Sequence, residues 1–251
     1  MPGDLRQPVS GRPGSSRETE HVPHISRGRA RANQMQWSLS RLNRVSTAPM
    51  QIARATADCL DAVLGLIEDA KNWLSTKDTN QWAAPWPDEA ARDARVFRGI
   101  QAGKTWIVWQ GGIPAATVTT ASRPSIAVWS PDTCECDLSE RAVYAHRLII
   151  ARRYSGAGLG ARLIDWVGLR GRHEYGAKWI RIDVWTSNRA LHDYYRKTGF
   201  ESCGFCADPT YPSGALFQKS ISKITPTGIP LFADHGKDSG LRAARIPACA
   251  W

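Results

Sequence analysis

The spacing of apolar residues predicts helices and strands in alternation between about residues 50 and 222. Within residues 58–74 apolar positions recur every three or four residues, the period of a helix with one buried face. Segments rich in apolar and β-branched residues at 105–110 and 115–121 predict strands, and the Gly111-Gly112 pair between them is typical of a hairpin turn. In chain order we expect a strand at 52–55, helices at 58–74 and from 88 to before 103, the two hairpin strands, a strand at 141–151, a helix at 158–174, a strand at 177–185, a helix at 188–199, and strands at 200–205 and 214–221.

The two ends of the chain differ from this central domain, 50–222. Residues 1–49 are rich in Arg, Pro, Gly and Ser without periodicity, and we expect a disordered basic tail; 223–251 predict a flexible C-terminal tail. Residues 1–50 hold eight arginines and three acids, so they contribute +5 of the net charge of +10. Residues 223–251 hold four basic residues and two acids and add +2. Most of the net charge therefore lies outside the folded part, so we do not expect nucleic acid as the partner, although the tail leaves it open.

No apolar run is long enough to span a bilayer, and the N-terminus lacks the apolar segment of a signal peptide. We therefore expect a cytoplasmic protein without a membrane partner. In that compartment free thiols are the default for the six cysteines. Cys134, Cys136, Cys203 and Cys206 could form a four-sulfur zinc site, but the first spacing is tighter than usual, and we expect no metal.

A glycine-rich segment follows the apolar run 144–150. It carries Gly156, Gly158 and Gly160 and leads into a helix, a junction whose backbone N–H groups suit a phosphate. A P-loop would need Gly-Lys-Ser/Thr here, and a dinucleotide fingerprint would need G-x-G-x-x-G, which this G-x-G-x-G lacks. The simpler interpretation is a helix N-terminus with tight turns and no ligand.

This segment resembles the acetyl-CoA-binding motif of the GNAT N-acetyltransferase superfamily, with Gly158 and Gly160 at its two glycine positions. Its Arg/Gln position holds Ser155, and Arg153 could supply the charge instead. A second family pattern matches farther on, with Asn188, then Tyr195, then Gly199-Phe200. The resemblance covers roughly residues 51–221.

The resemblance implies an α/β fold, with a mixed, mainly antiparallel central sheet, a splayed pair of parallel strands and flanking helices. It implies acetyl-CoA or another acyl-CoA as co-substrate, with the pantetheine arm along one splayed strand and the diphosphate at the glycine junction. The residues implied in this binding are Leu148, Ile149, Ile150, Arg153, Ser155, Gly156, Ala157, Gly158, Leu159, Gly160, Ala161, Asn188 and Tyr195.

Two side chains are candidates for proton transfer. Tyr195 matches the family's proton donor to the departing thiolate; the alternative is a tyrosine packed in the core. His146 is the candidate base or relay, because histidine exchanges protons near neutral pH, and the alternative is a structural strand histidine. Glu140 or water could serve as the base instead.

The acceptor side is less specified. We expect Trp82, Trp86 and Tyr144 to line a pocket for an apolar amine or a peptide side chain. The predicted function is direct transfer of an acyl group to a primary amine of a small molecule or peptide. Three alternative functions stay open: a macromolecular acetyltransferase acting on a protein N-terminus, a lysine or aminoacyl-tRNA, a non-catalytic CoA-binding module, and a dinucleotide binder. The protein could also form a homodimer.

Overall fold

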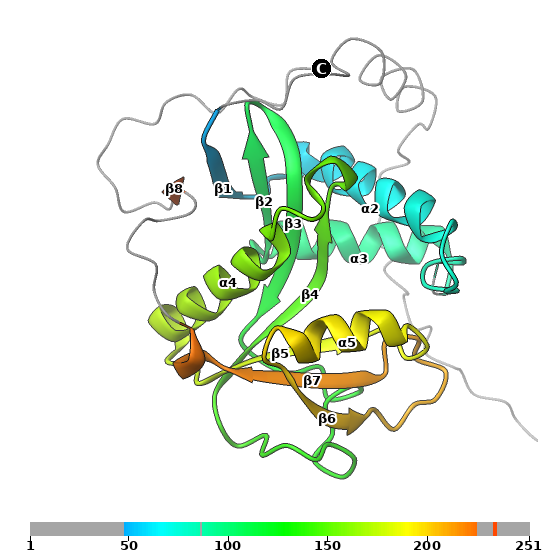
Figure 1. The fold of residues 1–251 in the computed structure, drawn as a ribbon, viewed down its shortest axis with the longest axis vertical. Helices are drawn as coiled ribbons and strands as arrows, with labels where there is room; N and C mark the ends of the chain where they lie inside the picture. The colour runs from blue at the N-terminus through cyan, green and yellow to red at the C-terminus, as the bar shows by residue number, and fades with distance from the viewer. Residues whose placement is uncertain (1–47, 86, 225–232, 235–251) are drawn as a thin grey trace, which may run out of the picture. The chain divides into compact units, whose positions relative to one another are not determined.

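A computed structural model describes residues 48–85, 87–224 and 233–234, all of which belong to one compact unit. The sheet runs in the order β6-β7-β5-β4-β3-β2-β1-β8, with helices packed against it (Figure 1). The elements are β1 (Met50–Arg54), η1 (Ala57–Cys59), α2 (Leu60–Leu74), α3 (Glu89–Gln101), β2 (Thr105–Gln110), β3 (Ile113–Ala121), β4 (Ala142–Ile150), η2 (Arg152–Tyr154), α4 (Leu159–Tyr175), β5 (Trp179–Val184), α5 (Arg189–Lys197), β6 (Glu201–Phe205), β7 (Ala215–Ser220), η3 (Ile221–Lys223) and β8 (Ala233–Asp234).

The predicted fold class is confirmed. Neighbouring strands are antiparallel except for β4 with β5 and the two-residue β8 with β1. The expected hairpin is β2–β3, and both of its turn glycines, Gly111 and Gly112, have positive φ values of 58° and 77°. Positive φ at both central residues is what the tight turn between twisted strands requires.

Helix ends follow their capping residues. Asp88 accepts a hydrogen bond from the N–H of Ala91 at 2.8 Å, and α3 begins at the next residue. Helix α4 ends at Gly176, whose φ of 62° is the left-handed conformation that closes a helix. At Gly171 a Cβ atom would come within 2.6 Å of Val143 Cγ1, so the glycine lets α4 lie directly on β4.

The fold extends slightly beyond the expected domain end at residue 222. Ile224 is buried, and β8 lies within the segment expected to be a tail. The predicted tails otherwise fall outside the described residues, as does Trp86. Among the residues that the structure describes, no helix is long and apolar enough to cross a membrane.

The apolar interior has two parts. The larger joins the sheet to α2, α3, α4 and α5. The smaller lies under the long loop between β3 and β4, around Val128, Trp129, Ala142, Tyr144, Cys203 and Leu216. In this second part Cys136 and Cys203 form a disulfide, so the expectation that all cysteines are free thiols is wrong for these two. Spacing could not show the pair, because 67 residues separate it.

Candidate active site

Strands β4 and β5 separate halfway along β4. They pair in parallel only from Ala142 with Trp179 to Ala145 with Ile182, whereas β4 continues to Ile150. Beyond Ala145, β4 stays paired with β3, and β5 stays paired with β7 as far as Val184. The side of β4 that faced β5 therefore has no strand partner from His146 onward, within the described residues.

A bulge coincides with this separation. The pairing of β3 with β4 shifts register between Thr117 and Thr119, and Arg147 has a φ of 48°, which a residue other than glycine rarely adopts. A bulge bends its strand and redirects its side chains. The bulge thus supplies a local reason for β4 to leave β5.

The glycine junction lies at the end of this free edge. Gly156 and Gly158 have φ values of 81° and 72°, and a Cβ atom on either would meet nothing within 4 Å. Within the described residues, none of the N–H groups from Gly156 to Ala161 donates to another group of the chain. Free amides at the start of a helix such as the seventeen-residue α4 are the kind of group that can bind an anion.

The flanking polar residues of the junction are partly engaged. Ser155 Oγ donates to the carbonyl of Arg152 and accepts from its guanidinium, both at 2.8 Å. Arg153 lies over the ring of Tyr154, with 5.3 Å between guanidinium carbon and ring centroid. Their predicted contact with an acyl-CoA stays a prediction.

His146 has a partner that the sequence did not reveal. Its Nδ1 lies 2.7 Å from Asp183 Oδ1, and Tyr211 donates its hydroxyl to Asp183 Oδ2 at 2.7 Å. Asp183 comes from β5 and Tyr211 from the loop between β6 and β7, so the three side chains meet only in the folded chain. The arrangement leaves His146 Nε2 as the ring nitrogen available to another group.

Asp183 is held as an anion. Burial opposes its ionisation, but the charge and the N–H of His146 and the hydroxyl of Tyr211 outweigh burial, and the pKa of Asp183 is lowered. The same contact acts in reverse on Tyr211, whose pKa is raised by burial and by the Asp183 charge. The carboxylate can therefore orient the His146 ring.

Tyr194 and Tyr195 are neighbours on α5, but Tyr195 is buried and Tyr194 is exposed. Tyr195 is 8% exposed, belongs to the larger core and packs edge-on against Phe200, and burial raises its pKa, so the phenol stays protonated. Tyr194 is 39% exposed, and its hydroxyl lies 3.1 Å from where a Cβ on Gly160 would stand. The second tyrosine, not noted as a candidate from the sequence, therefore borders the glycine junction.

Other predicted residues have structural partners. Asn188 caps α5 by accepting from the N–H of Leu191 at 3.0 Å, and donates to Gln81 of the α2–α3 loop at 2.6 Å. Glu140 is bound by Lys178 at 2.7 Å and by Trp179 at 2.5 Å, and these bonds lower its pKa, which weakens it as a base.

The predicted acceptor residues are dispersed. Tyr144 is 3% exposed and accepts a hydrogen bond from Arg181, which places it in the smaller core. Trp82 packs against the larger core, with a φ of 60°. We leave Tyr144 out of the proposed acceptor site, and the structure does not describe Trp86.

The comparisons agree with this geometry. The sequence model of the acetyltransferase (GNAT) family matches residues 67–200. An uncharacterized N-acetyltransferase, YesJ of Bacillus subtilis, is 30% identical over 162 residues, 64% of this chain and 85% of the relative. The chain belongs to the GNAT acetyltransferase family.

Solved structures share the fold. A GNAT-family acetyltransferase from Streptococcus agalactiae superposes with a TM-score of 0.53 at 21% identity, covering 68% of this chain and 95% of that one. One from Listeria monocytogenes gives 0.51 at 21% identity, covering 70% and 98%. Their agreement supports the mixed sheet with its parallel pair.

Proposed function

We propose that the protein transfers an acetyl group, or a related acyl group, from acyl-CoA directly to a primary amine. The observation that carries the proposal is the free edge of β4 from His146 to Ile150. It leads to six amides at the start of α4 that have no hydrogen-bond acceptor among the described residues. In this proposal Leu148, Ile149 and Ile150 offer backbone groups to the pantetheine arm, and residues 156–161 bind the diphosphate.

Acyl-CoA supplies the activated thioester, and the chain supplies proton transfer. His146 Nε2 takes a proton from the acceptor ammonium while Asp183 holds Nδ1 on the opposite side of the ring. Tyr195, whose phenol is protonated at neutral pH, donates its proton to the departing thiolate. No cysteine is needed in a direct transfer.

Charge near His146 favours particular acceptors. Arg147 follows His146 on the bulge. Burial is the largest cause of its lowered pKa, and the positive charges of Arg95 and Arg98 lower it further. Tyr211 and Asp183 act in the opposite direction but do not outweigh these effects. A site bordered by arginines disfavours a polycationic amine and helps an acceptor amine to lose its proton. We propose an acceptor without additional positive charge, such as an amino acid, a peptide or an uncharged aromatic amine.

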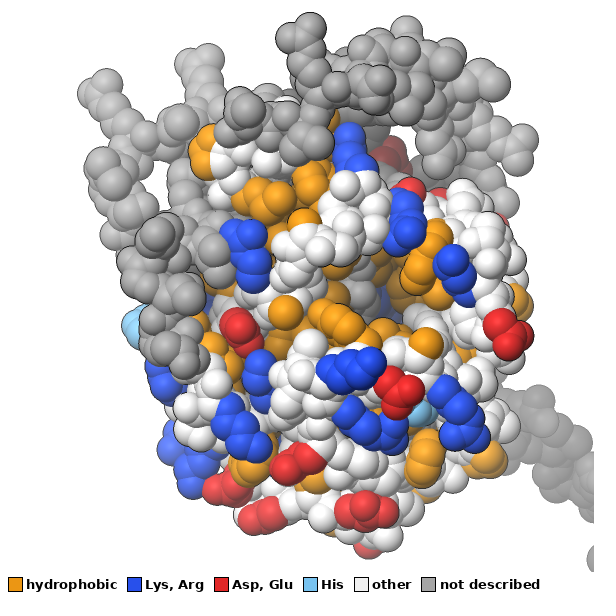
Figure 2. All heavy atoms as spheres, in the orientation of Figure 1, with side chains coloured by type: hydrophobic (Ala, Val, Ile, Leu, Met, Phe, Trp, Pro, Cys, Tyr) orange, Lys and Arg blue, Asp and Glu red, His pale blue; other side chains and the backbone are white. Residues whose placement is uncertain are grey.

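The macromolecular alternative rests on the basic N-terminal segment. On the face seen in Figure 2, however, Lys and Arg side chains of the described residues alternate with Asp and Glu side chains and form no continuous basic surface. This arrangement favours a small acceptor over a nucleic acid.

The test is binding followed by turnover. Native mass spectrometry of the full chain should show one acyl-CoA per chain, and thiol release should follow addition of an amine from the proposed classes. Failure to bind acyl-CoA would refute the proposal. A CoA-binding module would bind acyl-CoA but release no thiol with amino acids, peptides, arylalkylamines or polyamines. A macromolecular enzyme would act on proteins or tRNA and lose this activity when residues 1–47 are removed.

A further inference from the structure

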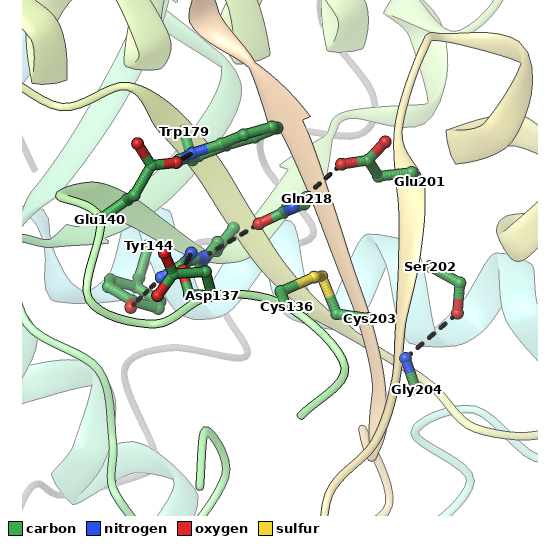
Figure 3. The surroundings of a disulfide bond; sticks show 11 residues. Cys136, Asp137, Glu140, Tyr144, Trp179, Glu201, Ser202, Cys203, Gly204 and Gln218 are labelled. Atoms are coloured by element: carbon green, nitrogen blue, oxygen red, sulfur yellow. Dashed lines mark hydrogen bonds between the residues drawn. A yellow bond between two sulfur atoms is a disulfide. The ribbon is translucent and has the colours of Figure 1, made fainter. Parts of the chain in front are cut away.

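Three cysteine sulfurs lie together outside the proposed active site. Cys134 and Cys136 come from the loop between β3 and β4, and Cys203 comes from β6. All three Sγ atoms lie within 4.8 Å of one another. Cys136 and Cys203 form the disulfide shown in Figure 3, and Cys134 is a partly exposed free thiol beside it.

Backbone contacts hold these positions independently of the disulfide. Cys134 pairs with Gly204 in an isolated antiparallel bridge, and the N–H of Glu135 donates to the carbonyl of Cys203 at 3.0 Å. The N–H of Cys134 also donates to Ser130 at 2.9 Å. The loop and β6 would therefore stay in register after reduction, with three thiols facing one point.

A buried cation adjoins the cluster. Arg181 is fully buried and donates to Tyr144 Oη, to Gln218 Oε1 and to the carbonyl of Asp137, the residue after Cys136. None of these acceptors is a carboxylate. The Asp137 carboxylate is exposed and accepts from Ser139 at 2.8 Å. The Asp137 carboxylate nevertheless interacts electrostatically with Arg181. An anionic centre beside Cys136 would add further negative charge near this buried guanidinium.

We propose that the reduced cluster is a metal site in which Cys134, Cys136 and Cys203 bind a thiophilic divalent cation such as Zn²⁺. Tetrahedral zinc with bonds of about 2.3 Å separates its sulfurs by about 3.8 Å, a spacing that small side-chain rotations can reach here. Three thiolates and Zn²⁺ carry one net negative charge, opposite to that of Arg181. A disulfide alone requires two cysteines and gives no reason for the third.

The fourth ligand is solvent in this proposal. Cys206 lies three residues beyond Cys203, but its thiol contacts the Asp208 carbonyl at 3.3 Å, and it is not among the three clustered sulfurs. The disulfide is the metal-free, oxidised form of the same site. A phosphine reductant breaks the S–S bond by giving two electrons and becomes a phosphine oxide. Water supplies the oxygen of the oxide and the two protons of the new thiols. Metal binding then releases three thiol protons.

Metal titration of the full chain tests the proposal. The protein is reduced with a phosphine, stripped with a chelator and titrated anaerobically with Co²⁺. We expect one ion per chain, with the near-ultraviolet charge-transfer band of cobalt thiolate, and displacement by Zn²⁺. Cys134→Ser should weaken binding by about 100-fold or more, since one of three thiolates is lost. Circular dichroism of this variant in its oxidised form checks folding, because it retains the disulfide pair.

The matched control is Cys206→Ser, which should bind Co²⁺ as tightly as the unsubstituted protein. Absence of the thiolate band in the reduced protein would overturn the site, as would unchanged affinity in Cys134→Ser. Loss of binding in Cys206→Ser would overturn the three-cysteine assignment. The readout is spectroscopic and needs no acyl-CoA, so its result is separate from that of the proposed function.

Discussion

Nδ1 of His146 lies 2.7 Å from Oδ1 of Asp183, across the point where β4 and β5 part. The carboxylate is buried, and its second oxygen accepts from Tyr211. A histidine held on one side by an anion presents its other nitrogen in a defined tautomer, which is how a general base is oriented. This contact is the structural basis on which we propose His146 as the base.

Replacing Asp183 with Asn should lower kcat by about 10²-fold or more, because the neutral amide no longer holds His146 Nδ1 with a buried negative charge. The steady-state pH profile should change shape, which a purely structural effect would not cause. Tyr211→Phe removes one neutral bond to the same carboxylate and should have the smaller effect. An Asp183→Asn enzyme with normal kcat and an unchanged pH profile would show that the pair is structural.

Tyr195→Phe should reduce kcat by about 10- to 10³-fold and leave the KM for acyl-CoA nearly unchanged, since only the proton donor is lost. Thiol-release kinetics with a saturating amine measure this. Tyr194→Phe is the neighbouring comparison. Its hydroxyl borders Gly160, so its loss should act on the KM for acyl-CoA. If kcat fell in Tyr194→Phe but not in Tyr195→Phe, Tyr194 would be the proton donor.

Gly158→Ala should weaken acyl-CoA binding and destabilise the fold by about 1 kcal/mol, because alanine at a φ of 72° is strained. Calorimetric titration and denaturant unfolding measure the two effects. Gly65→Ala is the control, because Gly65 lies inside α2 and a Cβ there meets nothing within 4 Å. That change should stabilise by about 0.5–1 kcal/mol without affecting binding. If Gly158→Ala and Gly65→Ala had the same acyl-CoA affinity, the glycine junction would not be the binding site.

Stability at acid pH should report the lowered pKa of Asp183. A carboxyl whose folded pKa lies below its unfolded value stabilises the fold above the unfolded value, near 3.9, and this contribution is lost as the pH falls through the folded pKa. The stabilisation that Asp183 gives relative to Asp183→Asn should therefore be present above about pH 4 and shrink as the pH falls below it. A difference that grows on acidification would contradict the assignment.

The sequence alone determined the order of helices and strands and the glycine junction, because these depend on local periodicity, capping and turn residues. The family came from the resemblance of two motifs, the glycine segment and the residues from Asn188 to Phe200. Asp88, Gly111 and Gly176 act within a few residues of themselves, so their effects can be read along the chain. The tertiary structure decided what depends on distant segments. Asp183 meets His146 only because β5 pairs in parallel with β4. Cys203 meets Cys136 only because β6 lies against the long loop between β3 and β4. Side-chain chemistry at such sites is set by register between strands, which residue spacing does not encode.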